Sequence, residues 1–239
     1  MTSSTWQQTE SDNDIMRMHV SVPASPAPAP GIVVIQHQGG VDEFVQNMTR
    51  RLADSGYVAA APDLYHRDGP DCKDDFVTRR SRLGDRRIIN DVNACVNYLQ
   101  RHDGVDGKRI GIIGFCMGGR VVYLMAAANP AFKAAVAYYG GNIFRAWGRD
   151  LLSPFERTGE IHCPLLSHFG AEDKNPSPED MGKLDEELTK FGKVHDFFSY
   201  PGASHAFMDS TKESYRRHAD DASWPRTLNF FGRHLSVTP

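Results

Sequence analysis

The chain has 239 residues, of which 40% are apolar and 24% are charged. This length suits one domain or two small ones, and the apolar fraction is too high for a disordered chain. Lys and Arg number 27 against 30 Asp and Glu, which gives a formal net charge of −3 at pH 7. This balance offers no strong field to nucleic acid or to an anionic membrane, so we expect neither as a partner.

The first 14 residues are polar and acidic, so they predict a flexible tail and no secretory signal. Residues 15–22 then alternate apolar and polar side chains, which is typical of an edge strand. Prolines interleaved with Ala and Ser between residues 23 and 30 predict a stiff, extended connector. We therefore expect a flexible tail over residues 1–14 and a single domain over residues 15–239.

Short apolar runs alternate with segments of helical periodicity through the rest of the chain. The apolar runs predict buried strands at residues 32–35, 57–61, 110–115, 134–139, 165–169 and 195–200. The periodic segments predict helices at residues 44–52, 88–99, 118–128, 179–191 and 224–235. This alternation indicates an α/β fold with a mostly parallel central sheet and helices on both of its faces. Ligands bind such sheets at the carboxyl ends of the strands.

The four cysteines are too few for a disulfide scaffold, and nothing in the sequence marks export, so we expect free thiols in a reducing cytosol. Three of them have no feature that favours reaction. Cys95 lies among the apolar residues of a predicted helix, Cys72 lies in a polar loop, and Cys163 comes just before a strand. The fourth, Cys116, lies in the most distinctive motif of the chain.

The segment from Gly114 to Gly119 reads Gly-Phe-Cys-Met-Gly-Gly and joins a buried strand directly to a helix. It matches the G-x-S-x-G nucleophile elbow with Cys116 in place of serine. The glycines give room for a sharp turn, and a helix amino terminus favours the thiolate form of the cysteine. A buried structural cysteine is the plain alternative. A dinucleotide-binding fingerprint fits badly, because Cys116 would stand where the backbone must approach a pyrophosphate.

A cysteine nucleophile needs a base, and the base needs an orienting acid. Asp173 follows the predicted strand at residues 165–169, and His205 follows the one at residues 195–200. Each has an ordinary explanation as a turn or loop residue, and Glu172 competes with Asp173 for the role of the acid. Together with Cys116 they occur in the order nucleophile, acid, histidine, each at the end of a strand, which predicts a catalytic triad.

With these three residues and the strand-end segment Pro62-Asp-Leu-Tyr65, the sequence resembles the dienelactone hydrolase family over roughly residues 15–235. The resemblance implies an α/β-hydrolase fold for the domain at residues 15–239. It also implies a cofactor-free hydrolase that cleaves a small carboxylic ester or lactone through a cysteine thioester. Two alternatives stay open: the same triad acting on another activated ester, such as a thioester or phosphoester, and a non-catalytic, redox-sensing thiol module.

The resemblance also implies roles for single residues. Cys116 would be the nucleophile, His205 the general base and acid, and Asp173 the residue that orients His205. The backbone N–H groups of Met117 and Gln38 would form the oxyanion hole. The partner would be a small-molecule ester or lactone, and the sequence leaves a homodimer open.

Two positions depart from the family pattern. His37 stands where the prototype of the family has a glutamate that holds the resting thiol, and a histidine cannot do the work of that carboxylate. It would either support the thiolate or contact substrate, or else bind backbone groups within a tight loop. Asp209 stands where the prototype of the family has an arginine that binds the carboxylate of the lactone, which argues against the same anionic dienelactone as substrate.

Other segments offer weaker candidates. Five arginines between residues 79 and 87 form either a solvated face or, if the segment folds over the site, a clamp for an anionic substrate. The long segment at residues 142–160 could form a cap, and we count Trp147, with His37 and Phe207, as a candidate substrate contact. The histidines near Cys163 match no zinc spacing, so we expect no metal.

Overall fold

The structure is a computed structural model that describes residues 2–24, 28–69 and 71–236. Part of the expected proline-rich connector, residues 25–27, lies outside the described residues. Within them no helix is long and apolar enough to cross a membrane, and no three His, Cys, Asp or Glu side chains gather as metal ligands would.

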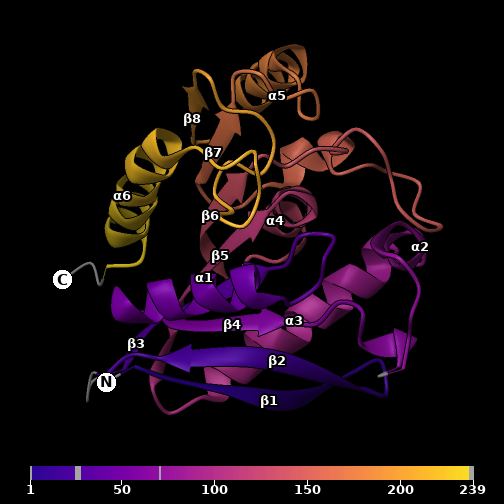
Figure 1. Ribbon diagram of the computed structural model, residues 1–239, viewed down its shortest axis with the longest axis vertical. Helices are drawn as coiled ribbons and strands as arrows, with labels where there is room; N and C mark the ends of the chain where they lie inside the picture. The colour runs from indigo at the N-terminus through magenta and orange to yellow at the C-terminus, as the bar shows by residue number, and fades with distance from the viewer. Residues whose placement is uncertain (1, 25–27, 70, 237–239) are drawn as a thin grey trace.

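Eight strands form one sheet in the order β1-β2-β4-β3-β5-β6-β7-β8, which Figure 1 shows from β1 at the bottom to β8 at the top. Their bounds are β1 Ser3–Ser11, β2 Asp14–Val22, β3 Ala29–Ile35, β4 Val58–Pro62, β5 Val105–Phe115, β6 Phe132–Tyr138, β7 Leu165–Gly170 and β8 His195–Tyr200. The six strands from β3 to β8 pair in parallel. β2 runs antiparallel to both β1 and β4.

Helices cover both faces of the sheet (Figure 1). The helical segments are α1 Glu43–Asp54, η1 His66–Asp68, α2 Phe76–Ser81, α3 Asp85–Arg101, α4 Met117–Ala128, η2 Phe155–Glu160, α5 Pro178–Lys190 and α6 Arg217–His234. The apolar sides of α3, α4 and α5 belong to one core, and those of α1 and α6 to a second core on the opposite face. Because the central strands are buried from both sides, their sequences are continuous apolar runs. The predicted α/β-hydrolase architecture is confirmed.

The expected flexible tail is wrong. Residues 3–11 form β1, which pairs with β2 from Ser3 opposite Val22 to Ser11 opposite Asp14. Asp12 and Asn13 form the turn with φ values of 51° and 67°, the left-handed conformation that a two-residue hairpin turn requires. β2 is therefore not an edge strand, because it lies between β1 and β4.

Candidate active site

Cys116 lies at the turn between β5 and α4, with φ 56° and ψ −116°. A positive φ is unfavourable for a residue with a side chain, so neighbouring contacts must hold it. The Cys116 N–H donates to the carbonyl oxygen of Tyr138 at 3.0 Å, and its own carbonyl accepts from the N–H of Gly119 at 2.9 Å. The turn thus presents the thiol at the carboxyl ends of the strands.

The glycines around Cys116 are required by close approaches of the backbone. A Cβ on Gly114 would collide with the carbonyl oxygen of Gly118, and a Cβ on Gly118 would collide with the carbonyl oxygen of Ile35. A Cβ on Gly119 would lie 2.7 Å from the Cα of Gly140 on the neighbouring loop. The elbow can therefore pack between β3 and β6 only without these side chains.

The structure brings the three predicted triad residues together. Nδ1 of His205 lies 2.8 Å from Oδ2 of Asp173, and the other oxygen of Asp173 accepts the N–H of Asn175 at 2.9 Å. Asp173 is 5% exposed, whereas its competitor Glu172 is exposed to solvent. Cys116, Asp173 and His205 line one cavity of about 340 Å³.

The surroundings of His205 favour its charged form. Burial on its own would lower the pKa of His205, but hydrogen bonds to Asp173 and Cys116 and the charges of both raise it to about 10. His205 is therefore protonated at neutral pH, and its positive charge lies between the Cys116 sulfur and the Asp173 carboxylate. A thiolate beside an imidazolium is the reactive form of a cysteine nucleophile.

Gln38 and Met117, expected to supply the oxyanion hole, line the same cavity. Met117 is the first residue of α4, and the N–H of a first helical residue has no partner within its helix. Gln38 lies in the loop that follows β3, directly beside the elbow in the sheet. Two backbone segments that carry N–H groups therefore border the space above the thiol.

Comparisons with known proteins show the family to which the chain belongs. The model of the dienelactone hydrolase family matches residues 16–235. The chain belongs to the dienelactone hydrolase family.

Relatives within the family are similar over most of their length. A Methylorubrum extorquens protein named "Putative carboxymethylenebutenolidase" is 33% identical over 219 residues, covering 90% of this chain and 75% of the relative. A Yersinia pestis protein of the same name is 34% identical over 223 residues, covering 89% of this chain and 81% of that relative. The crystal structure of a "Putative Dienelactone Hydrolase" from Klebsiella pneumoniae superposes with a TM-score of 0.89 at 30% identity, covering 98% of this chain and 99% of that one.

His37, which the resemblance places where the prototype of the family has a glutamate, is engaged within its own loop. Its Nε2 lies 2.8 Å from Oδ2 of Asp42, and its Nδ1 accepts the N–H of Gly39 at 3.1 Å. Both ring nitrogens are thus occupied, and His37 is not among the residues that line the cavity. Of the two interpretations drawn from the sequence, the structure favours the loop partner over the substrate contact.

The structure also corrects one of the other expected contacts. Trp147 lines the cavity as expected. Phe207 does not, because it is 0% exposed and packs against the rings of Tyr139 and Tyr200 in the core. Asp209, which the resemblance places where the prototype of the family has an arginine, is 4% exposed and accepts the N–H and the hydroxyl hydrogen of Thr211.

Among the five arginines, Arg80 on α2 lines the cavity, and its Nη1 lies 3.4 Å from the side-chain oxygen of Gln38. Arg79 and Arg82 instead bind Asp68. Lys174, which sequence reasoning missed, also lines the cavity. Its position directly after Asp173 in a strand-end loop was the signal available in the sequence.

Proposed function

We propose that this chain hydrolyses a small carboxylic ester or lactone by acylating Cys116. The observation that carries the proposal is the meeting of a thiol on a strained turn with a hydrogen-bonded His205–Asp173 pair in one cavity. Membership of the dienelactone hydrolase family supports the same reaction class.

In the first half of the reaction, the Cys116 thiolate attacks the carbonyl carbon of the ester. The negative charge that develops on the carbonyl oxygen is stabilised by the N–H groups of Met117 and Gln38, and aimed donors of this kind contribute about 3–4 kcal/mol each. The carbon–oxygen bond to the leaving group then breaks, and His205 gives its proton to the departing alkoxide. The products of this half are an alcohol and a thioester on Cys116.

Formation of the thioester prepares His205 for the second half. Acylation removes the thiolate charge, which is one of the contributions that raise the His205 pKa. Neutral His205 then accepts a proton from water, and the resulting hydroxide attacks the thioester carbonyl carbon. The carbon–sulfur bond breaks, the acid leaves, and the thiolate–imidazolium pair is restored.

The proposal predicts a trapped acyl group on one cysteine. When the protein reacts with a p-nitrophenyl ester of a small acid and is quenched in acid, intact-mass spectrometry should show one added acyl group, which peptide mapping locates on Cys116. Cys72→Ala is the matched control because Cys72 and Cys116 are both partly exposed, whereas Cys95 and Cys163 are buried. Cys72→Ala should acylate like the wild-type protein, and Cys116→Ala should not acylate.

Two outcomes would overturn the proposal. If Cys116→Ala and His205→Ala each kept full esterase activity, the triad would not carry the reaction. If Cys116 were readily oxidised but never acylated by any ester in a panel of neutral and anionic substrates, the redox-sensing alternative would replace the hydrolase.

The cavity also supports a proposal about the charge of the substrate. Arg80 and Lys174 both line it, and a hydrogen bond to a charged group contributes about 1.5–3 kcal/mol. We therefore infer that the preferred ester carries a carboxylate or another small anionic group. A reducing cytosol, which keeps a nucleophilic thiol free, is the location we propose for this chemistry.

The predicted consequence is a selective loss of affinity. Arg80→Gln should raise KM for a carboxylate-bearing ester by about tenfold or more, the factor that ~1.5 kcal/mol represents, and leave KM for the matched neutral ester nearly unchanged. Arg82→Gln is the control, since Arg82 lies in the same segment but binds Asp68 and Asp74. Equal effects of Arg80→Gln on both esters would contradict a role in recognising the anion.

A further inference from the structure

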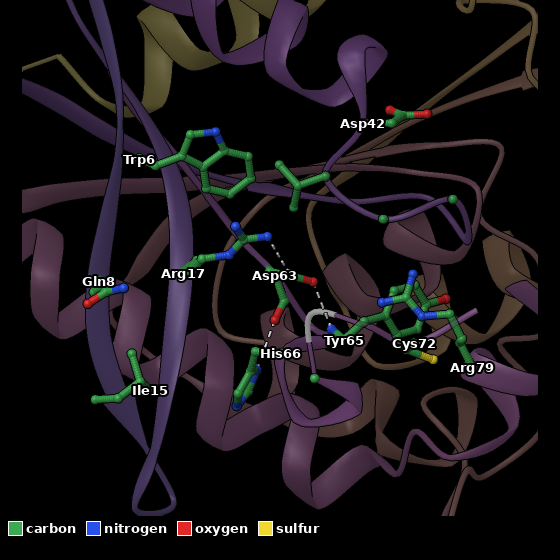
Figure 2. Close-up of a pocket in the computed structure, with 14 residues that line it drawn as sticks. Trp6, Gln8, Ile15, Arg17, Asp42, Asp63, Tyr65, His66, Cys72 and Arg79 are labelled. Atoms are coloured by element: carbon green, nitrogen blue, oxygen red, sulfur yellow. Dashed lines mark hydrogen bonds and ion pairs between the residues drawn. The ribbon is translucent and has the colours of Figure 1, made fainter. Parts of the chain in front are cut away.

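A second cavity of about 530 Å³ is bounded by the β1–β2 hairpin, the loop after β3 and the segment that follows β4 (Figure 2). Tyr65 is one of the residues that line it. In Figure 2 the Tyr65 side chain lies next to Arg79, on the side of this cavity away from Trp6 and Ile15. The hydroxyl of the same residue contacts the walls of the catalytic cavity, so Tyr65 separates the two spaces.

The Tyr65 hydroxyl touches both residues that we propose for the oxyanion hole. It donates a hydrogen bond to the carbonyl oxygen of Gln38 at 3.0 Å and lies 3.8 Å from the sulfur of Met117. These two residues come from different elements, the loop after β3 and the start of α4. A single hydroxyl group therefore contacts both segments that carry the proposed donors.

The Tyr65 ring itself is held firmly. The side chain is 3% exposed, and the guanidinium of Arg79 lies over the ring at 4.2 Å. Its backbone N–H donates to Oδ1 of Asp63 at 3.0 Å, a contact drawn in Figure 2. The Arg79 side chain is itself held by Asp68, whose Oδ2 lies 2.9 Å from Nε of Arg79. The hydroxyl thus has a defined position before any substrate arrives.

The loop that carries Gln38 needs such an anchor. It continues into Gly39 and Gly40, and Gly40 has a φ of 91°, in the left-handed region that glycine adopts without strain. A turn with two glycines has an unusually wide choice of backbone conformations. An oxyanion donor is effective only when its N–H is already aimed at the place where charge develops.

We propose that Tyr65 is a positioning residue that fixes the oxyanion hole by holding the Gln38 backbone against the start of α4. This inference rests on the proposed function, in which the Gln38 and Met117 N–H groups stabilise the transition state. Tyr65 contributes no proton to the reaction. It acts through the geometry of two backbone segments.

The protonation state of Tyr65 agrees with this role. Burial raises the pKa of the phenol to about 12, against the opposing effect of the nearby Arg79 and Arg80. The hydroxyl consequently stays a hydrogen-bond donor throughout the neutral range. The effect of Tyr65 on the rate should therefore not depend on pH between about 6 and 9.

The test is Tyr65→Phe, which removes the hydroxyl and keeps the ring that Arg79 covers. We expect kcat for ester hydrolysis to fall by about 10- to 100-fold, with KM within about twofold of the wild-type value, because the oxyanion exists only in the transition state. Alkylation of Cys116 by iodoacetamide forms no oxyanion, so its rate should not change. A trifluoromethyl ketone, which forms a charged tetrahedral adduct with a thiolate, should bind more weakly in proportion to the loss of kcat.

Tyr123→Phe is the matched control. The Tyr123 hydroxyl is also buried and also makes one hydrogen bond, 2.7 Å long, to Thr158. Tyr123→Phe should lower the melting temperature by about as much as Tyr65→Phe does, and it should leave kcat unchanged. A Tyr65→Phe variant that acylates at the wild-type rate, or whose alkylation slows as much as its acylation, would overturn the inference. Either result could coexist with an inactive Cys116→Ala, so it would leave the proposed function standing, whereas an active Cys116→Ala would remove both.

Discussion

Replacing Asp173 with asparagine is expected to lower kcat by about 10⁴-fold, the effect known for the equivalent change in a Ser-His-Asp triad. The asparagine oxygen can keep the bond to the N–H of Asn175, which leaves the amide nitrogen facing Nδ1 of His205. A donor at that place forces Nδ1 to accept and moves the ring proton to Nε2. The neutral ring then cannot take a proton from the thiol.

The same variant should change how thiol reactivity depends on pH. In the wild-type protein the pKa of His205 is raised to about 10, so the positive charge beside Cys116 persists up to about that pH. Without the Asp173 charge and hydrogen bond, the His205 pKa falls, so the positive charge beside Cys116 is lost at a lower pH. Alkylation of Cys116 near pH 7 should therefore slow, because the reactive thiolate loses the positive charge beside it.

Glu172→Gln is the control for both measurements. Glu172 is adjacent in the sequence and carries the same charge, but it is exposed to solvent. The Glu172→Gln variant should retain the wild-type kcat and the wild-type pH profile of Cys116 alkylation. If Asp173→Asn lowered kcat less than about tenfold, or if Glu172→Gln had an equal effect, Asp173 would not be the orienting acid.

The parts of the fold that were predictable are those in which burial dictates the sequence. Residues 32–35 in β3 have 0% exposure and form a continuous apolar run. β1 was not predicted because most of its side chains are exposed, so its sequence lacks an apolar pattern. The Asp-Asn turn after it was the one local signal. The first turns of α6 were missed for a similar reason, since residues 217–222 are mostly polar.

Which residues of the candidate site could be predicted also depends on whether a sequence pattern fixes their position. Cys116, Asp173 and His205 could be placed because each follows a recognisable strand, and strand ends of a parallel sheet meet at one edge. His37 could not be placed, because its direction depends on a bond to Asp42 five residues later. Phe207 follows His205 by only two residues, yet it turns into the core. Side-chain directions in loops depend on contacts that no periodic pattern reveals.

One contact that the sequence did not indicate has a large expected effect on stability. Arg120 on α4 and Asp85 at the start of α3 form a buried ion pair, with nitrogen–oxygen distances of 2.6 and 3.0 Å and side chains 0% and 1% exposed. Asp85 also accepts the N–H of Trp147 at 3.0 Å, and the Arg120 guanidinium lies over the Trp147 ring at 4.0 Å. The pair thus ties the elbow helix to a wall of the catalytic cavity.

Asp85→Ala should therefore lower the free energy of unfolding by about 3–5 kcal/mol, because it leaves the Arg120 charge buried without its partner. Urea denaturation followed by circular dichroism measures this change. Lys183→Ala is the control, since it breaks an ion pair with Glu179 whose side chains are 53% and 79% exposed, and solvent-exposed pairs contribute little. A loss below about 1 kcal/mol for Asp85→Ala would mean that water reaches Arg120 freely, in conflict with its burial. Because the backbone N–H of Trp147 loses its bond to Asp85 in the same variant, KM should rise even under conditions in which the protein stays folded.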